Sequence, residues 1–190
     1  MIFHKTKIKG AWIIELEPRI DKRGFYTRNF AKEEFAKQGI DFDVIHINRS
    51  FNKKKGTTRG FHYQLMPKSE DKILQVLRGK VYDVVLDLRK KSKTYGQWFS
   101  VELNPKKMNI VLCPKGCANA IQVLENNSEL QYFSSAAYSP ENERGIRFND
   151  PYFKIKWPFK KPTVISEKDS NWPLVKKENL PVVDLKTNEI

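Results

Sequence analysis

Short apolar-rich runs separated by turn residues dominate the first part of the chain. The run at residues 81–88, Val-Tyr-Asp-Val-Val-Leu-Asp-Leu, partly alternates apolar with polar positions and is rich in β-branched side chains, as a strand requires. Because such runs recur at a spacing of roughly ten residues, the pattern predicts an all-β sandwich or barrel. Strands are predicted at residues 11–16, 43–49, 58–64, 73–77, 80–88, 98–103, 109–112, 118–123 and 130–136.

Turn signals and one helical pattern divide these runs. Residues 78–80, Arg-Gly-Lys, and residues 126–127, Asn-Asn, have the composition of β-hairpin turns. Residues 31–38 predict a short helix, because Gly39 supplies the stop signal typical of a helix C-terminus. The sequence therefore predicts a β structure with few and short helices.

The pattern weakens after residue 150, where prolines recur and leave room only for loops and short helices. We interpret residues 151–190 as an arm that wraps a β core, and residues 1–150 as that core with an N-terminal arm. A chain of 190 residues is most simply one domain, so we predict a single domain over residues 1–190.

Composition excludes several classes of protein. No apolar run approaches the roughly 20 residues that span a bilayer, and residues 1–10 lack the apolar core of a signal peptide. Cys113 and Cys117 are the only cysteines and do not form a CxxC pair. Two lone cysteines without an export signal are typical of a reducing compartment. We therefore expect a cytoplasmic protein with no membrane contact.

The formal net charge of +13 has two interpretations. It indicates either attraction to an anion, such as nucleic acid or a phosphorylated small molecule, or a lysine-rich surface without a specific partner. The wide separation of the lysine clusters in the sequence favours the second. These clusters lie at residues 53–55, 90–91, 160–161 and 176–177. Because the chain contains no recognisable nucleic-acid-binding motif, we expect no nucleic acid partner.

Candidate chemistry centres on His62, one of only three histidines, which lies in the strand-like run Arg-Gly-Phe-His-Tyr-Gln at residues 59–64. A buried histidine in a β-barrel is often purely structural. Two features favour a functional role instead. Arg59 lies three residues away, which is unusual for an apolar core, and Asp169 follows a proline-rich turn from which a carboxylate can orient an imidazole.

The run at residues 59–64 resembles the central motif of the dTDP-4-dehydrorhamnose 3,5-epimerase family, in which leucine is usual in place of Phe61. Further matching segments follow in order along nearly the whole chain, at residues 21–25, 72, 79–84, 87–89, 95–98, 114–116, 132, 138, 149–151, 157–158 and 166–169. The resemblance implies a double-stranded β-helix, or cupin jelly roll, which agrees with the all-β pattern. It also implies a homodimer that exchanges an N-terminal strand, a role that residues 11–16 fit.

The resemblance implies a cofactor-free epimerisation of a nucleotide-linked 4-keto-6-deoxy sugar at C3 and C5. The ketone at C4 acidifies both carbons, so a base removes a proton and an acid returns one to the opposite face of an enolate. By resemblance, His62 is the base and Asp169 orients it. By the same resemblance, Tyr132 is the acid and Lys72 stabilises the enolate oxygen.

The resemblance also implies a binding site for the nucleoside diphosphate sugar. Arg23 and Arg59 are expected to meet the diphosphate, because a planar guanidinium makes paired contacts with phosphate oxygens. Phe25 and Tyr138 are expected at the nucleotide end. The full set of expected substrate-binding residues is Arg23, Phe25, Asn48, Arg59, Gln64, Asn119, Tyr138 and Lys168.

Three positions bear on metal binding and on specificity. Many cupins hold a metal through a His-x-His pair, but Gln64 stands where the second histidine would be, so we expect neither metal nor cofactor. Asn119 replaces a family histidine near the sugar, and an amide does not transfer protons near neutral pH. His46 replaces a family glutamine, and it either lines the pocket or is structural.

These departures leave two alternatives open. One is an epimerase that inverts C3 only, or that acts on a GDP- or CDP-linked sugar, since a changed hydrogen bond to the sugar shifts discrimination. The other is a non-catalytic cupin that binds nucleotide sugars, which the positive charge favours.

Overall fold

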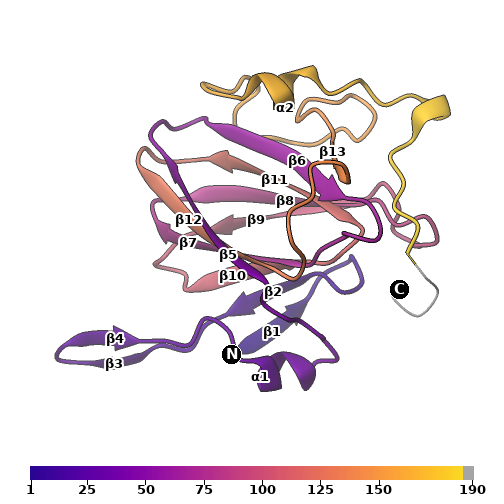
Figure 1. The fold of residues 1–190 in the computed structure, drawn as a ribbon. Helices are drawn as coiled ribbons and strands as arrows, with labels where there is room; N and C mark the ends of the chain where they lie inside the picture. The colour runs from indigo at the N-terminus through magenta and orange to yellow at the C-terminus, as the bar shows by residue number, and fades with distance from the viewer. Residues whose placement is uncertain (186–190) are drawn as a thin grey trace.

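The computed structural model describes residues 1–185, which form two antiparallel sheets that face each other across a shared core (Figure 1). The larger sheet contains, in spatial order, β1 (Ile2–Lys5), β2 (Trp12–Glu15), β10 (Asn109–Cys113), β7 (Lys72–Arg78), β12 (Ser128–Ser134) and β5 (His46–Asn52). The smaller sheet contains β13 (Glu143–Gly145), β6 (Thr58–Gln64), β11 (Cys117–Val123), β8 (Val81–Asp87) and β9 (Trp98–Leu103). The predicted all-β jelly roll is confirmed.

Apolar side chains fill the space between the sheets and also cover the outside of the smaller one. The central cluster contains Leu74, Val76, Val85, Val111, Ile121 and Leu130. The C-terminal segment contributes to a second cluster, which contains Phe61, Val84, Leu86, Ile146, Phe153, Val183 and Leu185. Val84 and Val85 enter different clusters, so both faces of β8 are buried, which explains the nearly continuous apolar run of this strand.

Helices are few and short, as predicted. Helix α1 (Lys32–Ala36) packs Phe35 against β2 of the larger sheet, in a cluster with Trp12 and Ile14. Helix α2 (Glu167–Asn171) and the 3-10 helix η1 (Lys177–Asn179) lie in the C-terminal segment. None of the helices in residues 1–185 is long and apolar enough to cross a membrane. The division into a β core and a wrapping arm within one domain stays a prediction.

Two predicted hairpin turns are wrong. Residues 78–80 join β7 of the larger sheet to β8 of the smaller one, and residues 126–127 join β11 to β12 in the opposite direction. The two turns pack together, since the Lys80 amide donates a hydrogen bond to the Ser128 hydroxyl at 3.2 Å. Turn composition does not reveal whether a chain folds back within one sheet or crosses to the facing sheet.

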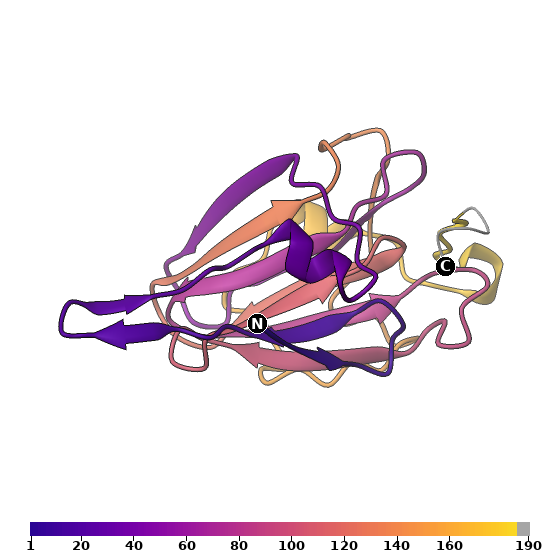
Figure 2. The ribbon, with the colours of Figure 1, turned by 90° about the horizontal axis from the view of Figure 1, so that it is seen from below.

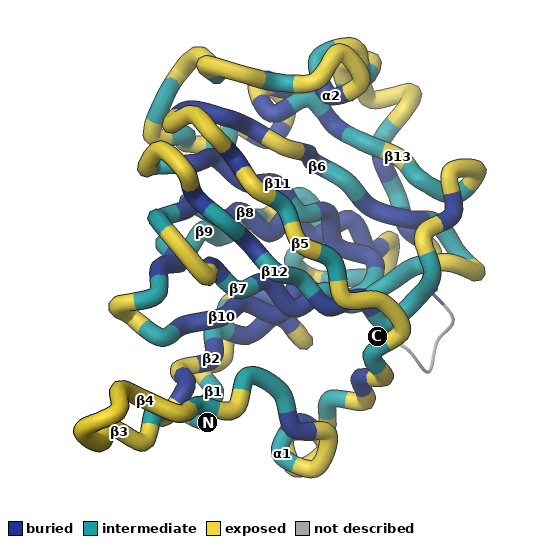
Figure 3. Tube along the Cα trace, turned by 60° about the vertical axis from the view of Figure 1, so that its left-hand side comes forward, coloured by how far each residue is buried: buried dark blue, intermediate teal, exposed yellow. Residues whose placement is uncertain are grey.

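The N-terminal region contains more strands than predicted. Residues 11–16 contain β2, which pairs with β1 on one side and β10 on the other within this chain, and the exchange of this strand with a partner stays a prediction. Among residues 1–185, β3 (Arg19–Asp21) and β4 (Gly24–Tyr26) pair only with each other. This hairpin stands away from both sheets in two views (Figure 1, Figure 2) and is exposed along its length (Figure 3).

A close approach of β6 to β11 requires glycine beside His62. Gly60 has a φ of +95°, and a Cβ there would lie 2.5 Å from the Asn119 carbonyl oxygen. We expect Gly60→Ala to lower the free energy of unfolding by about 3 kcal/mol, measured by urea denaturation. Gly39→Ala is the control, because Gly39 also has a positive φ, +74°, but no atom within 4 Å. Equal losses in both variants would show that the close approach is not the cause.

Candidate active site

His62 and Asp169 form a hydrogen-bonded pair although 107 residues separate them. His62 lies on β6 and Asp169 on α2, and the imidazole Nε2 lies 2.6 Å from Asp169 Oδ1. The Gly60 amide donates to Asp169 Oδ2 at 3.0 Å, and the Ser166 hydroxyl accepts from the Asp169 amide at 3.1 Å. Both carboxylate oxygens are therefore engaged, which fixes the orientation of the imidazole.

The surroundings of Asp169 keep its carboxyl ionised. Burial alone raises the pKa of a carboxyl, but the hydrogen bonds from His62 and the Gly60 amide hold the pKa of Asp169 below its ordinary value. An ionised carboxylate only accepts hydrogen bonds, so Nε2 of the neutral imidazole carries the proton. The Nδ1 nitrogen of His62 then offers its lone pair, which is the state that a general base requires.

A hollow of about 430 Å³ lies beside His62 and is lined from both sheets. His62 belongs to the smaller sheet, whereas Tyr132 and Lys72 come from β12 and β7 of the larger sheet. The Lys72 ammonium lies 2.8 Å from the Glu70 carboxylate. The lining also includes His46, Asn48, Gln64, Ser134 and Tyr138. An imidazole and a phenol thus reach one hollow from opposite sheets, as proton transfer on opposite faces of a sugar requires.

A second hollow of about 300 Å³ shares His62 and Glu143 with the first, and Arg59 and Lys168 line it together with Asp169. The Glu143 carboxylate pairs with the Lys168 ammonium and accepts a hydrogen bond from the Tyr138 hydroxyl at 2.6 Å. Burial would raise the pKa of Glu143, but these two donors hold it below its ordinary value. Two cationic groups, Arg59 and Lys168, therefore lie in the second hollow, in addition to Lys72 in the first.

Comparison with known proteins agrees with this geometry. A sequence model of the family described as dTDP-4-dehydrorhamnose 3,5-epimerase matches residues 5–177. The chain belongs to this family. The family resemblance carried by the ordered motifs is therefore confirmed, and with it the expectation of a sugar-nucleotide epimerase in the cupin jelly-roll class.

Relatives within the 3,5-epimerase family span almost the whole chain. A dTDP-4-dehydrorhamnose 3,5-epimerase of Methanothermobacter thermautotrophicus is 36% identical over 172 residues, which cover 90% of this chain and 92% of that protein. The crystal structure of a dTDP-6-deoxy-D-glucose-3,5-epimerase from Legionella pneumophila, in complex with dTDP-4-keto-L-rhamnose, gives a TM-score of 0.88 at 32% identity and covers 97% of this chain and 99% of that one. ChmJ, a 3'-monoepimerase from Streptomyces bikiniensis in complex with dTDP-quinovose, gives 0.84 at 32% identity and covers 90% and 86%.

Three residues expected in the 3,5-epimerase site, Arg23, Phe25 and Asn119, line neither hollow within this chain. Arg23 and Phe25 lie on the projecting β3–β4 hairpin and line neither hollow beside His62. Arg23 is held by the Asp21 carboxylate at 2.7 Å, and Phe25 is 60% exposed. Sequence order alone cannot say that this hairpin points away from its own sheets.

Gln64 lines the hollow, but its amide is already engaged with the backbone. Its Nε2 donates to the carbonyls of Lys68 and Ala137, and its Oε1 accepts from the Ser139 amide at 2.6 Å. The side chain is only 3% exposed. In this arrangement Gln64 fixes the loops beside the hollow, and a direct contact with substrate would break one of these bonds.

Asn119 lies opposite His62 on β11, turned toward a buried carboxylate. Its Nδ2 donates to both oxygens of Asp83, at 2.8 and 2.7 Å, and Asp83 is 0% exposed. Burial raises the pKa of Asp83 to about 7, and the hydrogen bond from Asn119 offsets only part of that shift. The Asn119 amide is therefore held by a buried carboxyl whose pKa lies near neutrality.

Replacing Asp83 by asparagine is expected to stabilise the fold increasingly as the pH rises. A carboxyl whose pKa is raised on folding contributes stability while it is protonated, below its unfolded pKa, and loses that contribution as the pH rises through about 7. We expect the free energy of unfolding of Asp83→Asn, relative to the unmodified protein, to increase by on the order of 4 kcal/mol from about pH 4 to about pH 8.

The matched control for this pH series is Asp169→Asn. Because folding lowers the pKa of Asp169, the stability that this carboxylate contributes is present above its unfolded pKa and is lost as the pH falls. Between about pH 4 and about pH 8, the difference in the free energy of unfolding between Asp169→Asn and the unmodified protein should therefore stay nearly constant in urea denaturation, and it should shrink only below about pH 4. A difference between Asp83→Asn and the unmodified protein that stays constant with pH would contradict the raised pKa.

Two residues of the site were not anticipated from the sequence. Glu143 joins both hollows, but it is the first residue of the three-residue strand β13, in a polar stretch that carries no pattern. Glu70 precedes Lys72 by two residues, a spacing that puts both side chains on one face of an extended segment. That spacing was a usable signal for Glu70, whereas nothing local in the sequence indicates Glu143.

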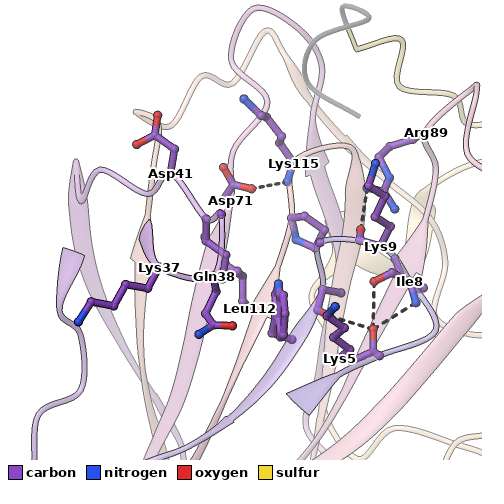
Figure 4. Close-up of a pocket in the computed structure, with 17 residues that line it drawn as sticks. Lys5, Ile8, Lys9, Lys37, Gln38, Asp41, Asp71, Arg89, Leu112 and Lys115 are labelled. Carbon is purple, nitrogen blue, oxygen red and sulfur yellow. Dashed lines mark hydrogen bonds between the residues drawn. The ribbon is translucent and has the colours of Figure 1, made fainter. Parts of the chain in front are cut away.

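A larger hollow of about 840 Å³ lies away from His62, between the β1–β2 turn, the segment after α1 and the loop after β10 (Figure 4). Lys5, Lys37 and Asp41 line it, and the Asp71 carboxylate accepts a hydrogen bond from the Lys115 amide at 2.9 Å. No histidine or tyrosine lines it, so it does not offer the imidazole and phenol that line the hollow beside His62. Among residues 1–185, no group of three or more His, Cys, Asp or Glu side chains is placed to hold a metal ion.

Proposed function

We propose that the protein inverts C3 and C5 of a dTDP-linked 4-keto-6-deoxy sugar without a cofactor. The observation that carries the proposal is that His62, held by Asp169, and Tyr132 line one hollow of about 430 Å³ from different sheets. His62 removes the acidic proton beside the C4 ketone, and Tyr132 returns a proton to the other face of the enolate. Because Tyr132 delivers this proton from the sheet opposite that of His62, the configuration at the carbon is inverted.

Lys72 supplies positive charge for the enolate oxygen. Its ammonium lines the same hollow and is held 2.8 Å from Glu70, so its position is set before substrate arrives. A preorganised cation stabilises the charge that develops as the proton leaves. Glu70 thereby acts as the positioning partner of Lys72.

Arg59 and Lys168 are proposed to bind the diphosphate in the second hollow. Arg59 is oriented by a hydrogen bond from its Nε to the Asn52 side chain at 2.8 Å, and Lys168 is oriented by Glu143. Both side chains line the second hollow, which adjoins the first at His62 and Glu143. Asn48 and Tyr138 line the sugar hollow, and the Legionella relative with dTDP-4-keto-L-rhamnose bound supports this class of ligand.

The decisive experiment incubates the protein with dTDP-4-keto-6-deoxyglucose in deuterated water and follows C3 and C5 by NMR. We expect deuterium at both carbons and conversion to the inverted sugar. Absence of exchange at either carbon for this substrate would refute the proposal.

A second candidate is inversion at C3 only. Asn119 in place of the family histidine favours it, and so does the similarity to a 3'-monoepimerase at a TM-score of 0.84. The same NMR experiment separates the two candidates, because a C3-only enzyme leaves the C5 proton unexchanged.

We further propose that the protein is a homodimer in the cytoplasm. The β3–β4 hairpin exposes Ile20, Phe25 and Tyr26 by 78%, 60% and 64%, and edge strand β5 exposes Ile47 and Phe51. Apolar patches of this kind mark protein interfaces, and a partner's hairpin would bring its Arg23 and Phe25 to a site that lacks them. Light scattering should give twice the chain mass, and Ile20→Asp should give a monomer. A monomeric unmodified protein would refute this assembly.

A further inference from the structure

Two lysine clusters that are far apart in the sequence meet on one surface of the fold. Residues 53–55 form the loop before β6, and residues 160–161 lie in the segment that leads to α2. All five lysine side chains are exposed. Figure 1 shows the segment before α2 passing along the start of β6.

Backbone hydrogen bonds hold the two segments side by side beyond the lysines. The Thr163 amide donates to the Gly56 carbonyl at 2.9 Å, and the Thr58 amide donates to the Val164 carbonyl at 2.9 Å. Thr57 and Val164 form a parallel bridge. The two lysine clusters therefore stand together at the start of a paired track.

Side chains anchor this track to the smaller sheet. The Lys55 ammonium lies 5.2 Å from the centre of the Phe159 ring. Gln122 on β11 binds Phe159 twice, since its Nε2 donates to the carbonyl at 3.0 Å and its Oε1 accepts from the amide at 2.8 Å. The lysines thus project from a fixed backbone.

The charge of the five lysines is not balanced locally. Within the part of the chain that the structure describes, none of them forms an ion pair with a carboxylate. Glu125, which lies next to the Asn126 side chain that accepts from the Lys55 amide, is paired with Lys80 at 3.7 Å. A cluster of uncompensated cations creates a positive potential that extends over about 10 Å at about 0.1 M ionic strength and further at lower salt.

The track leads directly into the candidate site. Thr57, Thr58 and Val164 line the hollow of about 300 Å³ that Arg59 and Lys168 also line. A negatively charged ligand that moves along the paired segments from the lysines therefore arrives at these two cations.

We propose that Lys53, Lys54, Lys55, Lys160 and Lys161 form an electrostatic track that captures the diphosphate of the nucleotide sugar and guides it to the site. The proposal rests on the proposed function for the identity of the ligand. A nucleoside diphosphate carries enough negative charge for such a cluster to raise its association rate without contacting it in the final complex. The lysines therefore act on capture and not on proton transfer.

Stopped-flow measurement of dTDP association tests the track. At low ionic strength, Lys54→Glu combined with Lys161→Glu should lower the association rate constant about fivefold, and about 0.5 M salt should remove the difference. The control combines Lys91→Glu with Lys93→Glu, which changes the net charge equally at exposed positions in the β8–β9 connection. The control should associate at the unmodified rate, and saturating turnover should be unchanged in both.

Three results would overturn the track. They are an unchanged association rate in Lys54→Glu/Lys161→Glu, an equal loss in the control, and absence of measurable dTDP binding to the unmodified protein. The outcome is separable from the proposed function, because association is measured without turnover. If the association rate of dTDP depends on the lysines and on salt as expected, but no substrate exchanges protons, the track proposal is supported and the epimerase proposal is refuted.

Discussion

Replacing His62 by alanine is expected to lower the rate of proton exchange at C3 and C5 by about three orders of magnitude. Two carboxylates also line the hollow, but Glu70 is paired with Lys72 and Glu143 with Lys168, so neither is free to act as the base. His62 instead has an ionised partner that fixes its protonated nitrogen. Exchange into substrate is measured by NMR in deuterated water, and dTDP binding is measured in parallel to show that the site is intact.

Asp169→Asn is the companion variant for His62→Ala. An amide in place of the carboxylate no longer requires the proton on Nε2, so the imidazole loses its fixed tautomer. We expect exchange to fall by about two orders of magnitude, with dTDP binding unchanged. If His62→Ala retained more than about a tenth of the exchange rate, another group would be the base and the mechanism would be wrong.

Local pattern predicted the elements of this fold well and their connections poorly. Residues 58–64 and 98–103 were predicted with the bounds that the structure gives β6 and β9. In contrast, β5 begins three residues later than predicted, and β1, β3, β4 and β13 were missed. The missed strands have three or four residues, too few for alternation to appear.

The turns at residues 78–80 and 126–127 show a different limit. Glycine and asparagine there supply positive φ values, as a hairpin needs, but the chain uses them to cross between sheets. Which sheet a strand joins depends on packing between segments that are far apart in the sequence. The jelly-roll assignment therefore came from the family motifs and not from the turns.

The candidate site was also predictable only in part. The motifs pointed to His62, Tyr132 and Lys72, and the structure brings them to one hollow, with Asp169 behind the imidazole. The bond between Asn119 and a buried carboxyl was not predictable, because it depends on the register of β8 against β11. The proximity of the lysine clusters at residues 53–55 and 160–161 was not predictable either, because the two clusters lie far apart in the sequence.

Replacing Tyr132 by phenylalanine is expected to separate proton exchange from inversion. His62 and Lys72 remain in place, so the enolate still forms and deuterium still enters the recovered substrate. The phenol that protonates the opposite face is missing, so formation of the inverted sugar should fall by about two to three orders of magnitude. NMR in deuterated water measures both quantities in one sample.

Tyr138→Phe is the matched control, because it also removes one phenol oxygen from the lining of the hollow. The Tyr138 hydroxyl is committed to Glu143 at 2.6 Å, and this bond raises the pKa of the phenol, so it is a poor proton donor. We expect Tyr138→Phe to raise KM while the ratio of exchange to inversion stays unchanged. If exchange and inversion fell together in Tyr132→Phe, Tyr132 would act before or during deprotonation. The acid would then have to come from solvent or from another residue of the larger sheet.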